Sequence, residues 1–380
     1  MRIHLASLLG AGCALTLLLQ APGSTAAPVS TARTSTLALT PLAADRVTGG
    51  QLRGLTARPT VGYSLLGVSW DDPSARLTGT VQVRTRAAGR WSGWHDLVAD
   101  SEDRPDTAEA TGSRARGATA PLWVGPSDGV EVRVSGAGPL PNGLRVELVD
   151  PGDGPSAAAA AAAPPAERAP RVLPAAEHPA PRPGIVTRSG WGADESLREP
   201  GFVYTGDVRA VFVHHTDSGN DYNCGDSPRV IRAIYQYHVR SNGWRDLGYN
   251  FLVDRCGIIY EGRAGGVARS VLGAHTLGFN TDSAGVAAIG TYVSDPPPQA
   301  QLDGIAKIAA WKLGLTDQDA TGTTTLTSTN DGSRYPAGTS HTFDAISGHR
   351  DAFNTECPGD ALFAKLDAIR DRAAHLQGRR

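Results

Sequence analysis

Residues 348–359 read GHRDAFNTECPG, which places the imidazole of His349 and the thiol of Cys357 eight residues apart. Taken alone, such a pair more often consists of ordinary residues satisfied by packing and hydrogen bonds. Zinc, however, prefers nitrogen and sulfur ligands in a tetrahedral shell, and a catalytic zinc site leaves one of its four positions for water. If this stretch supplies two ligands, a third must come from elsewhere in the chain.

A candidate for the third ligand stands at the end of residues 211–213, which read VFV. The β-branched residues of this run predict a buried strand, and His214 and His215 follow it directly. Successive side chains of a strand point to opposite faces of the sheet. Only one of the two histidines can therefore be a ligand.

The cysteine count supports a metal role for Cys357. Cys13 lies in a predicted signal peptide, so three of the four cysteines remain in the exported chain. An odd thiol in such a chain needs an explanation. If Cys224 and Cys256 form a disulfide, Cys357 is left over, and zinc would hold it as a protected thiolate. The alternative is that Cys224 and Cys256 are two buried thiols.

Six motifs follow one another along the second half of the chain. They are residues 188–193 (RSGWGA), 214–216 (HHT), 246–251 (DLGYNF), 260–263 (YEGR), 273–275 (GAH) and 348–359. In this order they resemble the peptidoglycan recognition proteins and the type 2 N-acetylmuramoyl-L-alanine amidases. The resemblance extends from about Arg188 to the C-terminal helix, which is about half of the chain.

The resemblance implies a Zn²⁺ site formed by His214, His349 and Cys357. It also implies catalytic roles for residues beside that site. Tyr249 is the candidate for orienting the attacking water or for donating to the oxyanion. Thr355 stands where some related amidases have a lysine and many recognition-protein amidases have a threonine, so this chain offers a hydroxyl without a charge.

Further residues are assigned by the resemblance, each with a structural alternative. Glu261 is a catalytic candidate, or a carboxylate that pairs with an arginine. Trp244, His275 and Asn280 line a groove for the glycan strand and stem peptide of bacterial peptidoglycan, or are ordinary loop residues. Arg263 completes the expected substrate-binding set.

The whole chain predicts a secreted, cell-wall-associated protein in several parts. Residues 1–27 have the apolar run and small residues of a signal peptide, and residues 28–58 are an N-terminal extension. Residues 59–150 form an all-β accessory domain, and residues 151–183 form an Ala/Pro-rich linker. Residues 184–380 form the amidase-like domain. No later stretch predicts a membrane anchor in the mature form.

Hydrophobic patterning separates the two domains. Val81 and Val83, and again Val130 and Val132, alternate with polar residues, which predicts short strands of a small antiparallel β-sandwich-like domain. Residues 184–380 instead mix strand-like and helix-like segments, which predicts an α/β domain with a mixed β-sheet flanked by helices.

The expected elements of the second domain can be given by residue. The hydroxyl of Ser227 is expected to cap a helix whose first residue is Pro228, and residues 249–254 and 258–261 form a hairpin. Leu302, Ile305, Ala309 and Leu313 mark another helix, and Leu362, Leu366, Ile369 and Ala373 mark the last one. In the first domain, Trp91 and Trp94 are core or edge residues, or a platform for a sugar.

Composition and motifs exclude several other functions. The formal net charge of −2 gives no electrostatic argument for binding nucleic acid. The chain has only three lysines, Lys307, Lys312 and Lys365, which leaves few candidates for a lysine-dependent mechanism. Residues 349–351 read HRD as in protein kinases, but no glycine-rich loop or DFG accompanies them.

Three hypotheses for the function remain, and the presence of the candidate ligands ranks them. The leading hypothesis is a zinc-dependent amidase that cuts the bond between N-acetylmuramic acid and L-alanine. The runner-up is a module that binds peptidoglycan without cutting it, as relatives that lack a ligand do. The third is a structural wall protein that has lost its activity. The presence of all three candidate ligands favours catalysis.

Overall fold

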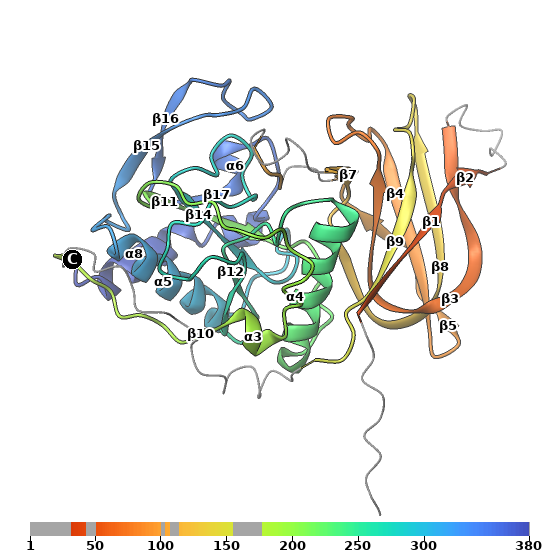
Figure 1. Cartoon of the computed structure of the whole chain (residues 1–380), viewed down its shortest axis with the longest axis horizontal. Coiled ribbons are helices and arrows are strands. Elements are labelled where there is room, and N and C mark those ends of the chain that lie inside the picture. The colour runs from red at the N-terminus through yellow and green to blue at the C-terminus, as the bar shows by residue number, and fades with distance from the viewer. Residues whose placement is uncertain (1–31, 43–50, 100–102, 107–113, 155–176, 380) are drawn as a thin grey trace, which may run out of the picture. The chain divides into compact units, whose positions relative to one another are not determined.

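The computed structural model describes residues 32–42, 51–99, 103–106, 114–154 and 177–379 (Figure 1). The predicted signal peptide and the alanine run of the predicted linker lie outside the described residues. Within the described part of the chain, no helix is both long and apolar enough to cross a membrane.

The first domain is a nine-stranded sheet in the order β1-β9-β3-β8-β4-β5, in which β2 and β7 pair with β3 and β6 pairs with β4. Every pairing in it is antiparallel. The strands are β1 (Arg33–Ala38), β2 (Thr40–Pro41), β3 (Gln51–Trp70), β4 (Thr80–Ala87), β5 (Arg90–Trp91), β6 (His95–Leu97), β7 (Gly117–Ala118), β8 (Leu122–Gly136) and β9 (Arg145–Asp150).

This sheet begins earlier than the sequence predicted. Residues 28–58 were expected to be an extension, but β1 pairs with β9 and the first part of β3 pairs with β8. The signal was missed because β1 reads RTSTLA and has no fully buried position. A mostly polar strand at the sheet edge lacks the apolar alternation from which strands are predicted.

Bulges in the long strand β3 accompany its pairing with two neighbouring strands, β8 and β9. Its register with β8 shifts three times between Leu55 and Leu65, and such bulges bend a strand. Beyond them, residues 65–69 pair with β9. The predicted alternation is confirmed, since Val81, Val83, Val130 and Val132 are all buried in the domain's core.

Trp91 and Trp94 lie outside that core. Both are half-buried, and the guanidinium of Arg84 lies 5.3 and 5.2 Å from their ring centroids. Arg133 lies 4.3 Å from the ring of Trp94. The tryptophans are therefore packed by arginine side chains, and a role in sugar binding stays a prediction.

The second domain is built on a six-stranded mixed sheet in the order β10-β13-β12-β14-β11-β17. Only the β12–β13 pair is antiparallel among these strands. The strands are β10 (Ile185–Val186), β11 (Ala210–His215), β12 (Phe251–Val253), β13 (Ile259–Glu261), β14 (Ser283–Ala288) and β17 (Ile346–Gly348), and a separate ribbon is formed by β15 (Thr323–Thr327) and β16 (Ser340–Asp344).

Helices cover both faces of the sheet (Figure 1). On one face, Val211 and Val213 of β11 share a core with α5 and α8, and on the other, Leu252 of β12 and Tyr260 of β13 pack with α4. The helices are α3 (Arg188–Trp191), α4 (Ser227–Gln236) with a π-helical continuation at Tyr237–Ser241, α5 (Gln299–Gly314), α6 (His349–Ala352), α7 (Asp360–Phe363) and α8 (Leu366–Leu376).

Two predicted helices differ in detail from the observed ones. Ser227 was expected to cap α4, but it is the first helical residue, and its hydroxyl donates to Asp254 Oδ2 at 2.8 Å. The predicted last helix is divided into α7 and α8. Its four apolar marker residues, Leu362, Leu366, Ile369 and Ala373, nevertheless lie in one core. Their spacing indicated the buried face but not the interruption.

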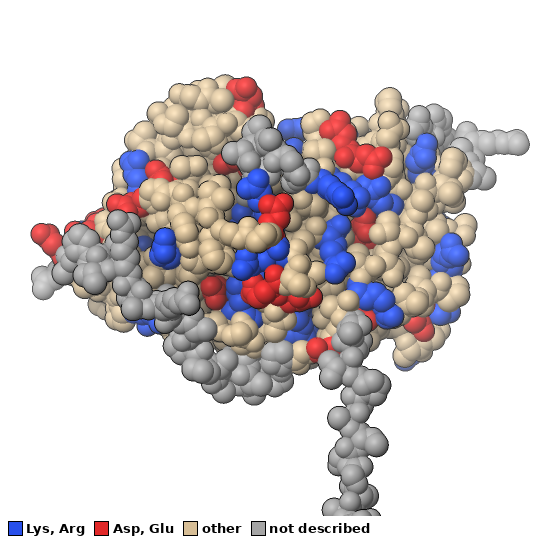
Figure 2. All heavy atoms as spheres, in the orientation of Figure 1, with Lys and Arg blue, Asp and Glu red and all other residues tan. Residues whose placement is uncertain are grey.

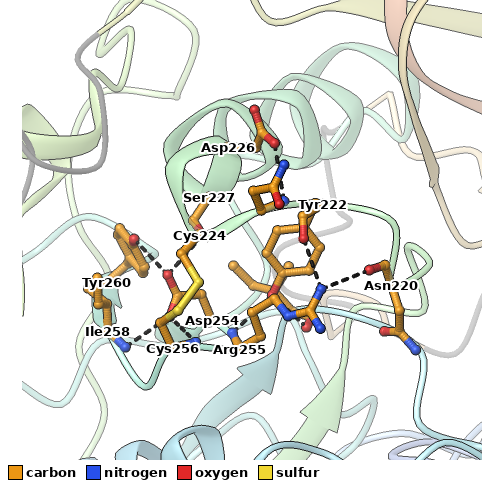
Figure 3. Close-up of a disulfide and its surroundings, with 12 residues drawn as sticks. Asn220, Tyr222, Cys224, Asp226, Ser227, Asp254, Arg255, Cys256, Ile258 and Tyr260 are labelled. Atoms are coloured by element: carbon orange, nitrogen blue, oxygen red, sulfur yellow. Dashed lines mark hydrogen bonds between the residues drawn. A yellow bond between two sulfur atoms is a disulfide. The ribbon is translucent and has the colours of Figure 1, made fainter.

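The predicted hairpin and disulfide are both confirmed. Cys224 and Cys256 are bonded, with 6.2 Å between their Cα atoms, and they join the entrance of α4 to the β12–β13 turn (Figure 3). Asp254 lies beside the bond and accepts hydrogen bonds from Ser227 Oγ, Tyr260 Oη and two main-chain amides (Figure 3). Closing a loop of 32 residues is worth about 3–4 kcal/mol in chain-entropy terms.

The β domain contributes to the core around α4. Leu65, Trp123 and Val149 are buried in the same cluster as Val230 and Ile234. On the face shown in Figure 2, basic and acidic side chains are interspersed rather than collected into separate fields.

Candidate metal centre

His214 and His215 are adjacent in strand β11, so their side chains point to opposite faces of the sheet and only one of them is a candidate ligand. His214 is paired with Ala287 and His215 with Ala288, and these alanines belong to the cores on opposite faces of the sheet. His214 is fully buried on the α4 face, and its Nδ1 lies 3.8 Å from Cys357 Sγ. His215 accepts a hydrogen bond from Tyr292 N on its Nδ1 instead.

His349 is the first residue of α6 and is also fully buried. The preceding amide, Gly348 N, donates to Asp351 Oδ2 at 2.8 Å, which fixes the start of the helix. Among the described residues, neither ring nitrogen of His349 has a hydrogen-bond partner. Buried polar atoms are rarely left in this state without a reason.

Cys357 lies in the turn between α6 and α7. Its amide donates to Thr355 Oγ1 at 2.9 Å, and its carbonyl accepts from Arg350 N at 3.0 Å. These two bonds hold the turn so that the thiol, which is buried, faces the histidines.

The three ligand atoms of His214, His349 and Cys357 all lie within 4.8 Å of one another. Burial lowers the pKa of both histidines to about 3, so both imidazoles are neutral at pH 7. A neutral imidazole offers the lone pair that a metal needs, and two nitrogens with one sulfur match the donors of zinc. The residues present therefore fit a zinc ion.

Two of the predicted substrate residues are buried beside the centre. His275 Nδ1 lies 3.2 Å from His214 Nε2, and Asn280 Oδ1 accepts from the amides of His275 and Thr276. Both His275 and Asn280 are fully buried. His275 therefore orients a candidate ligand, a role that the sequence did not predict, and a contact with substrate stays a prediction.

Tyr249 and Trp244 line a cavity of about 410 Å³ next to the metal centre. The ring of Tyr249 lies 5.5 Å from that of His214, and Trp244 packs at a tilt against His238 with 4.4 Å between the centroids. Thr355 lines a second cavity of about 630 Å³ together with Cys357 and Arg350. The structure thus brings Tyr249, Trp244 and Thr355 to cavities beside the ligands.

Glu261 and Arg263 lie in other surroundings. Glu261 Oε2 accepts from Arg188 N, and the Arg263 guanidinium donates to the carbonyls of Leu247 and Leu272. These bonds brace the chain after β13. A catalytic role for Glu261 and a substrate contact for Arg263 stay predictions.

One residue at the centre was not predicted at all. Asp103 comes from the β domain, and its Oδ1 lies 3.1 Å from His214 Nδ1 and 3.4 Å from His349 Nδ1. Its Oδ2 accepts a hydrogen bond from Tyr249 Oη at 2.6 Å. Burial raises the pKa of this carboxyl, against the opposing effects of His349 and of the Tyr249 bond. No sequence pattern marks it, since it is a single aspartate in a polar segment.

Comparisons with known proteins divide the chain in two. Residues 21–173 match the Rv3811 N-terminal galactose-binding domain-like family, and residues 204–360 match the N-acetylmuramoyl-L-alanine amidase family. The human N-acetylmuramoyl-L-alanine amidase is 33% identical over 190 residues, which are 48% of this chain and 28% of the human protein. The match thus spans less than a third of that relative.

Shorter relatives are matched over most of their length. Peptidoglycan-recognition protein LB of Drosophila melanogaster is 30% identical over 189 residues, which are 48% of this chain and 68% of the relative. The solved structure of Drosophila PGRP-LB is 27% identical with a TM-score of 0.38, and the alignment covers 48% of this chain and 92% of the other. Peptidoglycan recognition protein 1 of Bos taurus is 31% identical over 47% of this chain and 80% of the relative. The chain belongs to the family of the peptidoglycan recognition proteins and N-acetylmuramoyl-L-alanine amidases.

Proposed function

We propose that the chain is a secreted, zinc-dependent N-acetylmuramoyl-L-alanine amidase. Its substrate is the amide bond between N-acetylmuramic acid and L-alanine in bacterial peptidoglycan. The observation that carries the proposal is the ligand set, since the candidate ligand atoms of His214, His349 and Cys357 are buried within 4.8 Å of one another. Family membership supports the same reaction, because amidases are among the matched relatives.

His214, His349 and Cys357 would hold the zinc ion. Bound zinc supplies a nucleophile at neutral pH by lowering the pKa of water to about 7, and it polarises the amide carbonyl. His275 fixes the ring of His214 through the 3.2 Å contact at Nε2, which leaves Nδ1 for the metal. Such partners of ligand histidines set the ring orientation and the tautomer.

Tyr249 and Thr355 supply neutral hydrogen-bond donors. The Tyr249 hydroxyl shares the Asp103 carboxylate with both histidines, so it reaches the same small volume as the ligand atoms. We assign it to the oxyanion that develops on the substrate carbonyl. The Thr355 hydroxyl accepts from Cys357 N and can donate its own proton toward the adjoining cavity.

Binding of peptidoglycan without cleavage is the competing function, because several matched relatives are named recognition proteins. The complete ligand set argues for cleavage. The cavity beside Tyr249 and Trp244 is the part of the site that we assign to the substrate.

The test is digestion of purified peptidoglycan by the full-length chain, with products identified by mass spectrometry. The chain is assayed as prepared, after chelation and after zinc is returned. The Asp103→Ala variant is assayed beside it, because Asp103 approaches both histidines. New L-alanine amino termini that disappear on chelation and return with zinc are expected. Binding without cleavage by either protein at any zinc concentration would overturn the proposal.

A further inference from the structure

Residues 103–106 reach the metal centre from the β domain, and the proposed reaction makes no use of them. The carboxylate of Asp103 contacts both histidine ligands and Tyr249. Within the described part of the chain, its Oδ1 is buried without a hydrogen-bond partner, as are both ring nitrogens of His349. The Oδ1 atom of Asp103 and the Nδ1 atom of His349 thus lie 3.4 Å apart in a buried site, and neither makes a hydrogen bond to a described residue.

The distances between these atoms are those of ligands around a common metal. Two ligands at about 2.0–2.1 Å from a tetrahedral zinc are about 3.3 Å apart, and carboxylate oxygens bind zinc at this distance as imidazole nitrogens do. The Oδ1 atom of Asp103 lies 3.1 and 3.4 Å from the Nδ1 atoms of His214 and His349. Toward both histidines, it therefore has the spacing expected of a fourth ligand.

The rest of the segment is attached to the loop that follows His275. The buried Asp106 carboxylate accepts from Gly278 N at 2.6 Å, and the Arg104 carbonyl accepts from Asn280 Nδ2 at 3.2 Å. Asp103, Arg104 and Pro105 line the same cavity as Trp244 and Tyr249. The segment thus forms part of the wall of the cavity that we assign to the substrate.

The β domain that carries this segment is itself held against the second domain. Trp123 N donates to Ser218 O at 2.9 Å, and Tyr237 Oη donates to Thr119 O at 3.1 Å. A Cβ added at Gly67 would stand 2.2 Å from the Tyr237 hydroxyl, so the backbone of β3 approaches this helix as closely as glycine permits. These contacts hold the β domain against the second domain independently of the metal ligands.

We propose that Asp103 is an internal fourth ligand of the metal centre and that its carboxylate occupies the position that water and substrate would take at the metal. The chain is then a latent form, in which substrate reaches the metal only after the segment withdraws. The ligand assignment stands on the geometry alone, whereas the latency rests on the proposed amidase activity.

Metal binding tests the ligand assignment without any assay of activity. Full-length wild type, Asp103→Ala and the isosteric Asp103→Asn are loaded with Co²⁺ for visible absorption, and the zinc dissociation constant of each is measured by competition. Asp128→Asn is the matched control, because Asp128 is an exposed aspartate of the same domain that pairs with Arg86. Thermal unfolding of the metal-free proteins establishes that each variant is folded.

We expect Asp103→Ala to bind zinc about 10–100-fold more weakly and to change the cobalt spectrum, because one ligand is exchanged for water. The control should match wild type in both measurements. Identical spectra and zinc affinities for Asp103→Ala and wild type would overturn the assignment.

Hydrolysis of purified peptidoglycan tests the latency. Asp103→Ala is expected to act at least tenfold faster than wild type at saturating zinc, and Asp106→Asn, which weakens the attachment to Gly278, should show a smaller gain. Slower hydrolysis by Asp103→Ala would overturn the latency and make Asp103 a catalytic residue. If no protein cleaves but the zinc affinity falls as expected, the ligand assignment stands and the proposed amidase activity fails.

Discussion

The two faces of the six-stranded sheet bury different kinds of side chain. Under α5 and α8, the buried residues are mainly aliphatic, as with Val213, Val286 and Ile305. Under α4, apolar residues are joined by buried imidazoles and phenols such as those of His214 and Tyr260. A buried polar group costs free energy unless it is paired, so the α4 face depends on specific partners and the α5 face depends on packing.

We infer from this difference that the α5 and α8 face mainly stabilises the fold and that the α4 face carries the chemistry. The candidate ligand His214 and its partner His275 meet on the α4 side, while the apolar core on the other side holds the strands that carry them. If the assignment is right, substitutions on the two faces should separate metal binding from folding stability.

The adjacent histidines of β11 give the largest expected contrast. His214→Gln should weaken zinc binding about 1000-fold or more, because it removes one of the candidate protein ligands. His215→Gln should leave zinc affinity within about tenfold, because glutamine can still accept the bond from Tyr292 N. The measurement is a competition titration against a chromogenic zinc chelator. Equal losses in the two variants would remove the distinction between the faces.

On the apolar face, Ile305→Ala should cost about 2–5 kcal/mol of unfolding free energy, because Ile305 is fully buried and its removal leaves a cavity. Zinc affinity of the folded protein should not change. Lys307→Ala is the matched control on the same helix, since Lys307 is exposed and should cost less than about 0.5 kcal/mol. Urea unfolding measures both. A loss of zinc affinity as large as the loss of stability would contradict a purely structural role for this face.

Much of the candidate metal centre was predictable because its residues are marked by local patterns in the sequence. His349 and Cys357 stand eight residues apart, and the apolar run before His214 predicts the strand that carries it. Alternation along a strand then allows only one of His214 and His215 to face the site. The cysteine count left two alternatives for Cys224 and Cys256, a disulfide or two buried thiols, and the disulfide is observed.

The remaining features depend on contacts that no local pattern encodes. Asp103 reaches the histidines only because the β domain packs against α4, and a single aspartate carries no periodicity. His275 was assigned to the groove, but its side chain turns inward to His214. Which way a loop side chain points is set by its neighbours in space, and the sequence does not list them.

Within the α4 face, two tyrosines separate catalysis from packing. Tyr249→Phe should lower kcat about 100-fold, because it removes the donor assigned to the oxyanion, and should leave zinc bound. Tyr260→Phe is the matched control, since its hydroxyl donates to Asp254 Oδ2 at 3.0 Å. It should lower the unfolding free energy by about 1 kcal/mol and leave kcat unchanged. Turnover and zinc content are measured for both, and an unchanged kcat in Tyr249→Phe would reduce Tyr249 to packing.

The smallest expected effect concerns the dependence of the α4 face on pH. Burial lowers the pKa of His238 to about 3, with a further contribution from Arg263, whereas an unfolded histidine titrates near about 6.5. Between these values the unfolded chain binds a proton that the folded chain does not, so stability falls as pH drops below 6.5. The other buried histidines act in the same direction.

His238→Gln isolates the share of one residue, because glutamine can still accept the bond from Gly248 N but does not titrate. From pH 6.5 toward pH 5, the folding equilibrium constant of wild type should fall relative to that of the variant by up to about tenfold per pH unit. Urea unfolding of both proteins at pH 7.5 and pH 5.0, without metal, measures the difference. If the folding equilibrium constants of wild type and His238→Gln depend on pH in the same way, the fold does not keep the imidazole of His238 neutral. The pH dependence of stability would then come from other buried groups on the α4 face.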